Sequence, residues 1–357
     1  MNPSTSWTRR PIATPSARRT VRRCAAALAG VALAGTAAAG CGSAAGGSGR
    51  TTTLRYQGSA GQVTPPELAQ DLGYLGEVKL KWVGNTISGP QDIQSAATGQ
   101  TDFGGAFNGA VIKLQAAGAP LTSVIGYYGS DKDSYNGFYV PKDSPIKGPR
   151  DLIGKKIGMN TLGAHSEAVL DIYLQRGGLS PAEVKKAEPL VVPPVNTEQS
   201  LRQGQIDVGV LGGIFREKAE AAGGVRKVFS DYDLLGAFTG GTYVFRDDFV
   251  KRNPDTVKAF TAGVAKAIEW ARTTPRDQVI ARFTKIVQAR GRNESPDALK
   301  YFKSYGVAGR GGVIAEKEFT TWITWLEQQG QIPKGKVKVG DLYTNRFNPY
   351  AGDGSRG

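Results

Sequence analysis

The sequence predicts a two-lobed α/β protein, on three observations. Its 357 residues are enough for about two domain-sized units. From Thr51 onwards, short β-rich runs alternate with helical runs, which favours an α/β fold with mainly parallel sheets. Ser95–Gly104 is similar to Ser200–Gly209, 105 residues further on. That spacing is too long for a solenoid repeat and fits two similar lobes.

A second pair of similar segments sets the expected limits of the lobes. Tyr139–Asp143 is similar to Tyr243–Asp247, and we interpret the two segments as the places where the chain crosses between lobes. The first lobe is then expected at residues 51–138 and 243–357, and the second at 139–242.

Local patterns predict the individual elements. Val78, Leu80 and Trp82 alternate with lysines, which is typical of a half-exposed strand at 77–83. Thr64 and Glu67 form a capping-box pattern that begins a helix, and Ser88 precedes a second helix. Further strands are expected at 121–128 and 155–160, further helices at 164–176, 254–272 and around 319–326, and a loosely packed tail after residue 335.

Residues 1–40 are expected to be an export signal. A basic segment precedes a short run of small apolar residues, Cys24–Gly40, that is too short for a stable membrane span. The small residues before Cys41 resemble the lipobox of bacterial lipoproteins, in which the cysteine carries lipid, and a Gly/Ser-rich tether follows at 41–50. We therefore expect a lipid anchor at Cys41 on the outer face of the cytoplasmic membrane. Plain secretion with Cys41 unmodified is the alternative, and the general and twin-arginine export routes both stay open.

Composition excludes several classes of function. The formal charge is +14, but the first 40 residues hold six arginines and no acid, which leaves a balance of +8 for the rest. No block of like charges indicates a nucleic-acid groove. The chain has 2 cysteines, Cys24 and Cys41, and its one histidine is His165. No metal site, cofactor or catalytic thiol is therefore expected.

Four motifs, in order along the chain, resemble one family. They are Asp71–Leu75, Gly99–Phe103, Ile146–Gly158 with its Asp-Leu-Ile-Gly-Lys-Lys-Ile core, and Asn253–Phe260. Together they resemble extracellular solute-binding proteins of the nitrate/sulfonate/taurine type, a group that includes relatives binding thiamine-precursor pyrimidines. The resemblance implies a type II periplasmic-binding-protein fold with two crossing strands and a ligand cleft between the lobes. It also implies delivery of the ligand to the permease and ATPase of an ABC importer, by a protein that we expect to be a monomer.

The candidate ligand contacts lie in loops that join strands to helices. Ligands of open α/β sheets bind beyond the carboxyl ends of the strands, where helix N-termini offer free N–H groups to anions. The family places an anion-binding turn at the position of Thr161. The expected ligand-binding residues are Ser59, Ala60, Gly61, Gln62, Ser88, Asn108, Tyr128, Thr161, Gly163, Ala164, His165, Gly213 and Thr239.

Structural alternatives stay open for several of these residues. Ser88 and Asn108 could serve only as helix caps, and Tyr128 could belong to the core. His165 could be a satisfied histidine without ligand contact. Arg216 is expected on a solvated helix face rather than in the cleft.

The leading hypothesis is capture of an organic sulfonate or similar anion without chemistry. The alternative ligand is a thiamine-precursor pyrimidine or another small heterocycle, and the alternative role is a sensor that presents ligand to a membrane receptor. An enzyme is disfavoured, because the family's enzymatic lineages rely on cysteine chemistry and no cysteine follows residue 41.

Overall fold

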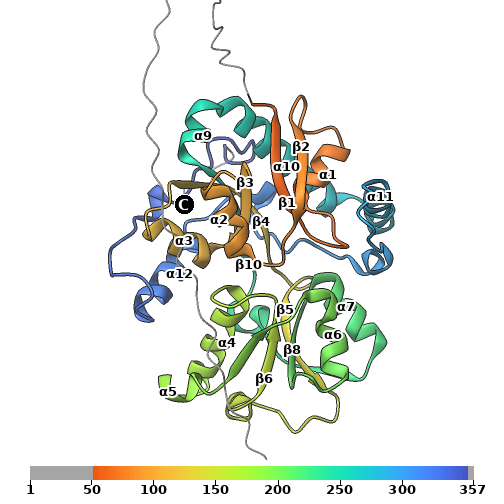
Figure 1. Ribbon diagram of the computed structural model, residues 1–357, viewed down its shortest axis with the longest axis vertical. Coiled ribbons are helices and arrows are strands. Elements are labelled where there is room, and N and C mark those ends of the chain that lie inside the picture. Colours follow the sequence, from red (N-terminus) through yellow and green to blue (C-terminus); the bar gives the residue numbers. More distant parts are fainter. Residues whose placement is uncertain (1–50, 353–357) are drawn as a thin grey trace, which may run out of the picture. The chain divides into compact units, whose positions relative to one another are not determined.

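Three sheets organise residues 51–352, the part of the chain that the computed structural model describes (Figure 1). A parallel pair joins β1 (Thr53–Gly58) to β2 (Lys79–Asn85). The second sheet has the order β3-β10-β4 and the third the order β7-β6-β8-β5-β9. Their strands are β3 (Phe103–Phe107), β4 (Leu121–Ser130), β5 (Asn136–Pro141), β6 (Lys156–Met159), β7 (Glu188–Val191), β8 (Val208–Gly212), β9 (Val225–Ser230) and β10 (Phe238–Arg246).

The sheets form two lobes, which confirms the predicted fold class. The five-stranded sheet and its helices make the second lobe, drawn in yellow and green in Figure 1, and the other two sheets belong to the first lobe. The chain leaves the three-stranded sheet after Ser130 and enters the five-stranded sheet at Asn136. It returns between Ser230 and Phe238. The expected limits of 139–242 stay a prediction, and the strand ends favour crossings a few residues earlier in each case.

The sheets are mixed, so the prediction of mainly parallel sheets is wrong. β1–β2, β6–β7 and β6–β8 are parallel pairs, whereas β10 is antiparallel to both β3 and β4, and β5 to both β8 and β9. Parallel neighbours need a crossover connection. β5 and β10 instead enter their sheets directly from the other lobe, and both run antiparallel to their neighbours.

The predicted helices are present, with bounds that differ by a few residues. Glu67 Oε2 accepts hydrogen bonds from the N–H and the hydroxyl of Thr64, both at 3.0 Å, which confirms the capping box. Among the described residues, no helix combines the length and the apolar character needed to cross a membrane. The helices are α1 (Pro65–Asp71), α2 (Gly89–Ala97), α3 (Asn108–Ala116), α4 (His165–Arg176), α5 (Pro181–Val184), α6 (Pro194–Arg202), α7 (Gly213–Ala222), α8 (Asp231–Leu235), α9 (Asp247–Arg252), α10 (Pro254–Thr273), α11 (Arg276–Ala289) and α12 (Lys317–Gln328).

The internal repeat builds the same strand start in each lobe. Asp102 immediately precedes β3, and its Oδ2 accepts the N–H of Arg55 at 2.7 Å, while its own N–H donates to Arg55 O. Asp207 immediately precedes β8 and makes the matching pair of bonds with Lys156, at 2.8 and 2.9 Å. Each aspartate therefore fixes the start of a strand next to the neighbouring one, a physical reason for its place in both copies.

The segment after residue 335 packs onto the first lobe, so the expectation of a loose tail is wrong for its described part. Leu342 and Phe347 are buried, and Tyr343 forms a parallel bridge with Ser123. Thr344 N–H donates to Ser123 O at 2.9 Å. Polar composition suggested exposure, but a few apolar side chains and an uncovered β4 edge are enough to hold the segment.

We expect Asp102→Ala to destabilise the protein by about 2–3 kcal/mol and Asp207→Ala by about 1 kcal/mol. Asp102 also pairs with the Arg55 guanidinium at 2.7 Å, so its loss breaks more bonds. Equilibrium urea unfolding of both variants checks the order, and an equal or reversed cost would contradict it.

Candidate ligand-binding site

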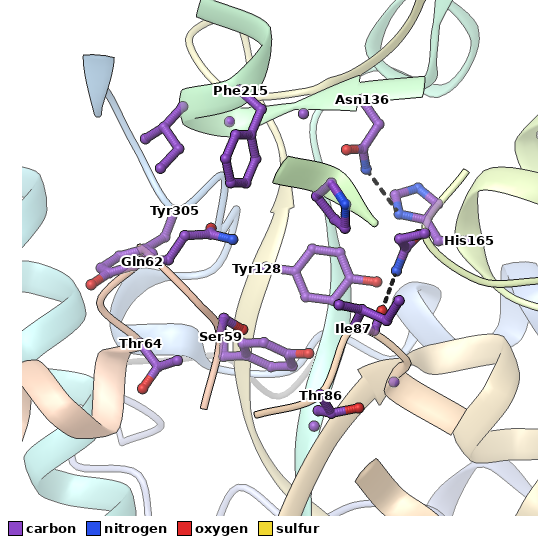
Figure 2. Close-up of a pocket in the computed structure, with 18 of the residues that line it drawn as sticks. Ser59, Gln62, Thr64, Thr86, Ile87, Tyr128, Asn136, His165, Phe215 and Tyr305 are labelled. Carbon is purple, nitrogen blue, oxygen red and sulfur yellow. Dashed lines mark hydrogen bonds between the residues drawn. The ribbon is translucent and has the colours of Figure 1, made fainter. Parts of the chain in front are cut away.

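A cavity of about 410 Å³ lies between the lobes and is lined by loops from both. From the first lobe come the segments after β1, before α2 and at the ends of β3 and β4, together with residues 299–305. From the second come the loops before α4, α6 and α7. Figure 2 shows Phe215 and Asn136 approaching from the second lobe, opposite Ser59 and Thr86 from the first. The volume suits a small organic solute.

Most of the predicted ligand contacts line this cavity. The structure brings together nine of them from five loops and strand ends that are distant in sequence. They are Ser59, Ala60, Gln62, Ser88, Tyr128, Thr161, Ala164, His165 and Gly213.

Gly61 and Gly163 do not line the cavity, because the protein's own carboxylates take their amides. Gly61 N–H donates to Glu294 at 3.0 Å, and Gly163 N–H donates to Glu167 at 2.5 Å. Burial alone would raise the pKa of Glu294, but the Gly61 N–H and the Arg290 guanidinium hold that pKa below its usual value. Both residues were expected to contact the ligand, and their amides are instead committed within the protein.

Asn108 and Thr239 also lie off the cavity, fully buried inside the first lobe. Asn108 Nδ2 donates to the carbonyl oxygens of Thr239 and Glu318, both at 3.2 Å. Thr239 N–H donates to Glu318 Oε1, and Ala308 N–H donates to the Thr239 hydroxyl. The Asn108 side chain joins β10 to α12, and the Thr239 hydroxyl joins β10 to Ala308. Their positions in the sequence did not reveal these tertiary roles.

His165 is both a cavity wall and a buried, partnered side chain. Its ring stacks on Phe107, with centroids 5.2 Å apart, and its Nε2 lies 3.2 Å from Asp231 Oδ2. Its Nδ1 lies 3.3 Å from Asn136 Nδ2 (Figure 2). The histidine therefore connects the N-terminus of α4 to the crossing segments.

Asp231 holds the two crossing segments together. It is fully buried, and its Oδ1 accepts hydrogen bonds from the Ser130 hydroxyl at 2.9 Å and from Asn136 N–H at 3.0 Å. Ser130 ends β4, Asn136 begins β5, and Asp231 begins α8. One carboxylate thus ties the outgoing connection to the returning one.

Within residues 51–352, none of those that line the cavity is a lysine or an arginine. Arg216, expected on a solvated face, is buried, so that expectation is wrong. Its guanidinium lies 3.6 Å from the Tyr135 ring centroid, donates to Asp133 O and pairs with Glu217. Stacking on an aromatic ring and pairing with an acid allow a guanidinium to leave water.

A group of arginines lies behind the loop that follows β1 and supports it. Arg290 donates to Gln62 O at 2.8 Å and to Ser59 O at 3.4 Å, and it pairs with Glu67 and Glu294. Arg292 pairs with Glu67 at 2.9 Å. Paired carboxylates balance these cations, which position the loop without lining the cavity.

Aromatic side chains supply much of the wall. Tyr127 stacks on Tyr243, with centroids 4.0 Å apart, and Tyr127 contacts Tyr128 edge-on. The aromatic residues that line the cavity lie far apart in the sequence, between Phe107 and Tyr305. Of these, only Tyr128 was predicted, from its position at the end of a strand. The aromatic lining residues are Phe107, Tyr127, Tyr128, Tyr135, Phe215, Tyr243, Phe283, Phe302 and Tyr305.

Asp92, on α2, is the carboxylate that lines the cavity, and the sequence analysis missed it. Its Oδ2 accepts Gly105 N–H at 2.7 Å. Burial raises the pKa of Asp92 to about 7, and the Gly105 N–H opposes that rise. An acid in the first turn of a helix is usually read as a partner of the helix dipole, so its position alone gave no signal.

Hydrogen bonds cross between the lobes at the rim of the cavity. The hydroxyls of Ser88 and Thr161 lie 3.2 Å apart, and Asn160 Nδ2 donates to Ile87 O at 2.8 Å. Lys113 Nζ also donates across the gap, to Gly163 O. The lobes are therefore in contact on the side of α2 and α4.

Comparison with known proteins identifies the family. A family model described as NMT1/THI5 like matches residues 61–278. The chain belongs to this family. The family predicted from the sequence motifs is thereby confirmed.

Relatives of this NMT1/THI5-like chain include proteins named for binding and for synthesis. A Brucella abortus protein named as a binding protein is 25% identical over 57% of this chain and 61% of its own length. The Saccharomyces cerevisiae 4-amino-5-hydroxymethyl-2-methylpyrimidine phosphate synthase THI12 is 25% identical over 59% of this chain and 64% of its own length. The chain therefore spans less than two thirds of these relatives.

A solved structure gives the same fold. The alkanesulfonate-binding protein SsuA from Xanthomonas axonopodis pv. citri, bound to MOPS, superimposes with a TM-score of 0.64 and 21% identity. The match covers 83% of this chain and 99% of that one. The fold of this NMT1/THI5-like chain is thus that of periplasmic solute-binding proteins.

We expect the free energy of unfolding of Asp92→Asn, relative to that of the wild type, to be about 2 kcal/mol higher at pH 8 than at pH 5. The raised pKa means that the folded protein holds the Asp92 proton more tightly than the unfolded chain does, so the wild type alone loses stability as pH rises through that range. Urea unfolding at both pH values measures the difference. Exposed Asp143→Asn is the control, and a constant difference for Asp92→Asn would contradict the expectation.

We expect the double variant Ser88→Ala, Asn160→Ala to populate an open form more than the wild type. It removes two bonds across the rim, each of about 1 kcal/mol, and their sum of about 2 kcal/mol would shift the equilibrium about thirtyfold. Small-angle X-ray scattering should give a larger radius of gyration than for the control Arg252→Ala, which removes an exposed ion pair within one lobe. Equal radii would show that these bonds do not hold the lobes together.

Proposed function

We propose that this chain is an exported solute-binding protein that encloses a small solute between its lobes and passes it to the permease of an ABC importer. The support is the cavity between two lobes joined by two crossing segments, a design in which solute contact with both lobes favours closure. The membership of the NMT1/THI5-like family and the fold shared with SsuA support the same function.

The lining favours a flat, uncharged or weakly basic heterocycle over the oxyanion that the sequence suggested first. The observation that carries this choice is that the described lining residues combine aromatic walls and one carboxyl group with no lysine or arginine. The amides of Gly61 and Gly163 are bound to glutamates. Aromatic rings are recognised well by stacking and edge contacts with such walls.

One feature still favours the sulfonate as a second candidate. Helix α4 begins at the cavity, its N-cap Ala164 provides no side-chain cap, and the hydroxyls of Thr161 and Ser166 come from lining residues. A helix N-terminus attracts anions. SsuA, which has the same fold, is an alkanesulfonate-binding protein.

We infer that the solute is bound without chemistry. The yeast relative is named a synthase, but residues 42–357 of this chain contain no cysteine, and its one histidine is held by Asp231 and Asn136. The expected export signal, the lipid anchor at Cys41 and the position outside the cytoplasmic membrane belong to the same proposal. They concern residues 1–50, which lie outside the described residues.

Native mass spectrometry of the full chain purified from its own cells tests this function. We expect a bound small molecule that is released unchanged on denaturation, and thermal stabilisation when it is added back. Conversion of the added compound into another compound during incubation with the protein would indicate an enzyme. The absence of any bound solute, with no stabilisation by heterocycles, alkanesulfonates or nitrate, would reject the proposed function.

A further inference from the structure

A second hollow, of about 430 Å³, lies on the first lobe near the start of β1. Thr51, Thr53 and Arg55 line this hollow, whereas Gln57 and Gly58, at the end of the same strand, line the cavity between the lobes. The strand has six residues and spans about 20 Å. No described residue lines both spaces, so the hollow is distinct from the site proposed for the solute.

Cations outnumber carboxylates in this hollow. The basic side chains that line it are Arg55, Lys81, Arg246 and Arg252. Among the described lining residues the acid is Asp102, which pairs with Arg55. Arg246 and Arg252 share one carboxylate, Asp248. Within residues 51–352, Lys81 forms no ion pair, so four cations stand against two acids and two positive charges are left unbalanced.

Strand pairing places two of these cations side by side on an accessible face. Arg55 of β1 is the register partner of Lys81 of β2, and register partners project from the same face of a sheet. Leu54 and Tyr56, which alternate with Arg55, are buried in the core. The side chain of Arg55 is 39% exposed and Lys81 is exposed. An anion can therefore reach both cations from solvent.

The hollow also lies where the described chain begins. Thr51 N–H donates to Asn253 Oδ1 at 3.0 Å, which holds the start of the chain beside the end of α9 (Figure 1). Cys41 precedes Thr51 by ten residues in the sequence, and a chain of that length reaches at most about 36 Å. An anchor at Cys41 would therefore keep the hollow close to the membrane surface.

We propose that this hollow docks the first lobe on an anionic membrane, with a lipid phosphate bound among its cations. A phosphodiester carries one negative charge, and its oxygens fit the paired donors of a guanidinium. Each basic residue near an anionic lipid surface strengthens binding about fivefold. The cavity lies at the other end of β1 and stays clear of the lipid. This inference goes beyond solute binding and rests on the export and anchor proposed above.

The competing explanation is that these cations only stabilise the first lobe through ion pairs. The double variant Lys81→Gln, Arg252→Gln separates the two roles. Lys81 has no ion pair among the described residues, and the pair of Arg252 with Asp248 is exposed, so both changes cost little stability. Lys185→Gln, Lys186→Gln is the matched control, because it removes the same charge from exposed positions of the second lobe.

Partition of the full chain between buffer and lipid vesicles tests the proposal. The vesicles contain phosphatidylcholine alone or phosphatidylcholine mixed with phosphatidylglycerol. We expect the Lys81/Arg252 double variant to bind the anionic vesicles about 25-fold more weakly than the wild type, a factor of about five for each charge, and the neutral vesicles equally well. The control should bind both like the wild type. Residues 1–40 are the same in all three proteins, so their ratios report the hollow.

Other results overturn the proposal in distinguishable ways. Unchanged binding of the double variant to anionic vesicles, or an equal loss in the control, would show that the hollow does not dock the lobe on the membrane. Displacement of the wild type by inorganic phosphate, compared at equal ionic strength, would assign the hollow to a soluble anion instead. A 25-fold loss together with an unmodified Cys41 in protein from its own cells would support docking and reject only the anchor.

Discussion

Buried carboxylates that accept backbone N–H groups hold the cleft in shape. Glu294 binds the amide of Gly61, Asp92 that of Gly105, and Asp231 that of Asn136. Each of these amides lies in or beside a segment that borders the cavity. A loop near the interior must satisfy its backbone donors, and a charged acceptor does so strongly. These bonds position a loop after β1, a residue of β3 and the start of β5 at the border of the cavity.

The same constraint shapes what the cleft can recognise. A loop amide that already donates to a glutamate is not free to bind a sulfonate. The nearby Arg290 donates to the loop after β1 and pairs with Glu67 and Glu294. The described residues that line the cavity supply aromatic and aliphatic surface, hydroxyl groups, carboxamides, the His165 ring and the Asp92 carboxyl. Because function depends on the site rather than the fold, sharing the fold of an alkanesulfonate-binding protein does not by itself fix the solute.

Sequence patterns predicted a structural feature correctly where the feature is formed by residues close together in the chain. The capping box at Thr64 and Glu67, and the strand starts at Asp102 and Asp207, involve a few neighbouring residues or one adjacent strand, and the sequence displays them directly. Loops after strands gave most of the cavity positions, because the carboxyl ends of strands meet at one edge of a sheet. The errors came where a polar residue had two uses. Asn108 was predicted to cap a helix or to donate to the ligand, but its side chain instead joins β10 to α12.

The sequence by itself determined the α/β alternation, the two-lobed fold, the family and the loops that approach the cleft, because periodicity, capping and motif order are properties of neighbouring residues. Only the tertiary structure decided which donors stay free, that Arg216 stacks on Tyr135 inside the protein, and that Asp92 faces the cavity beside Tyr127 and Tyr243. Those outcomes depend on pairings between residues far apart in the chain. Burial then sets whether a charge is balanced within the protein or offered to a solute.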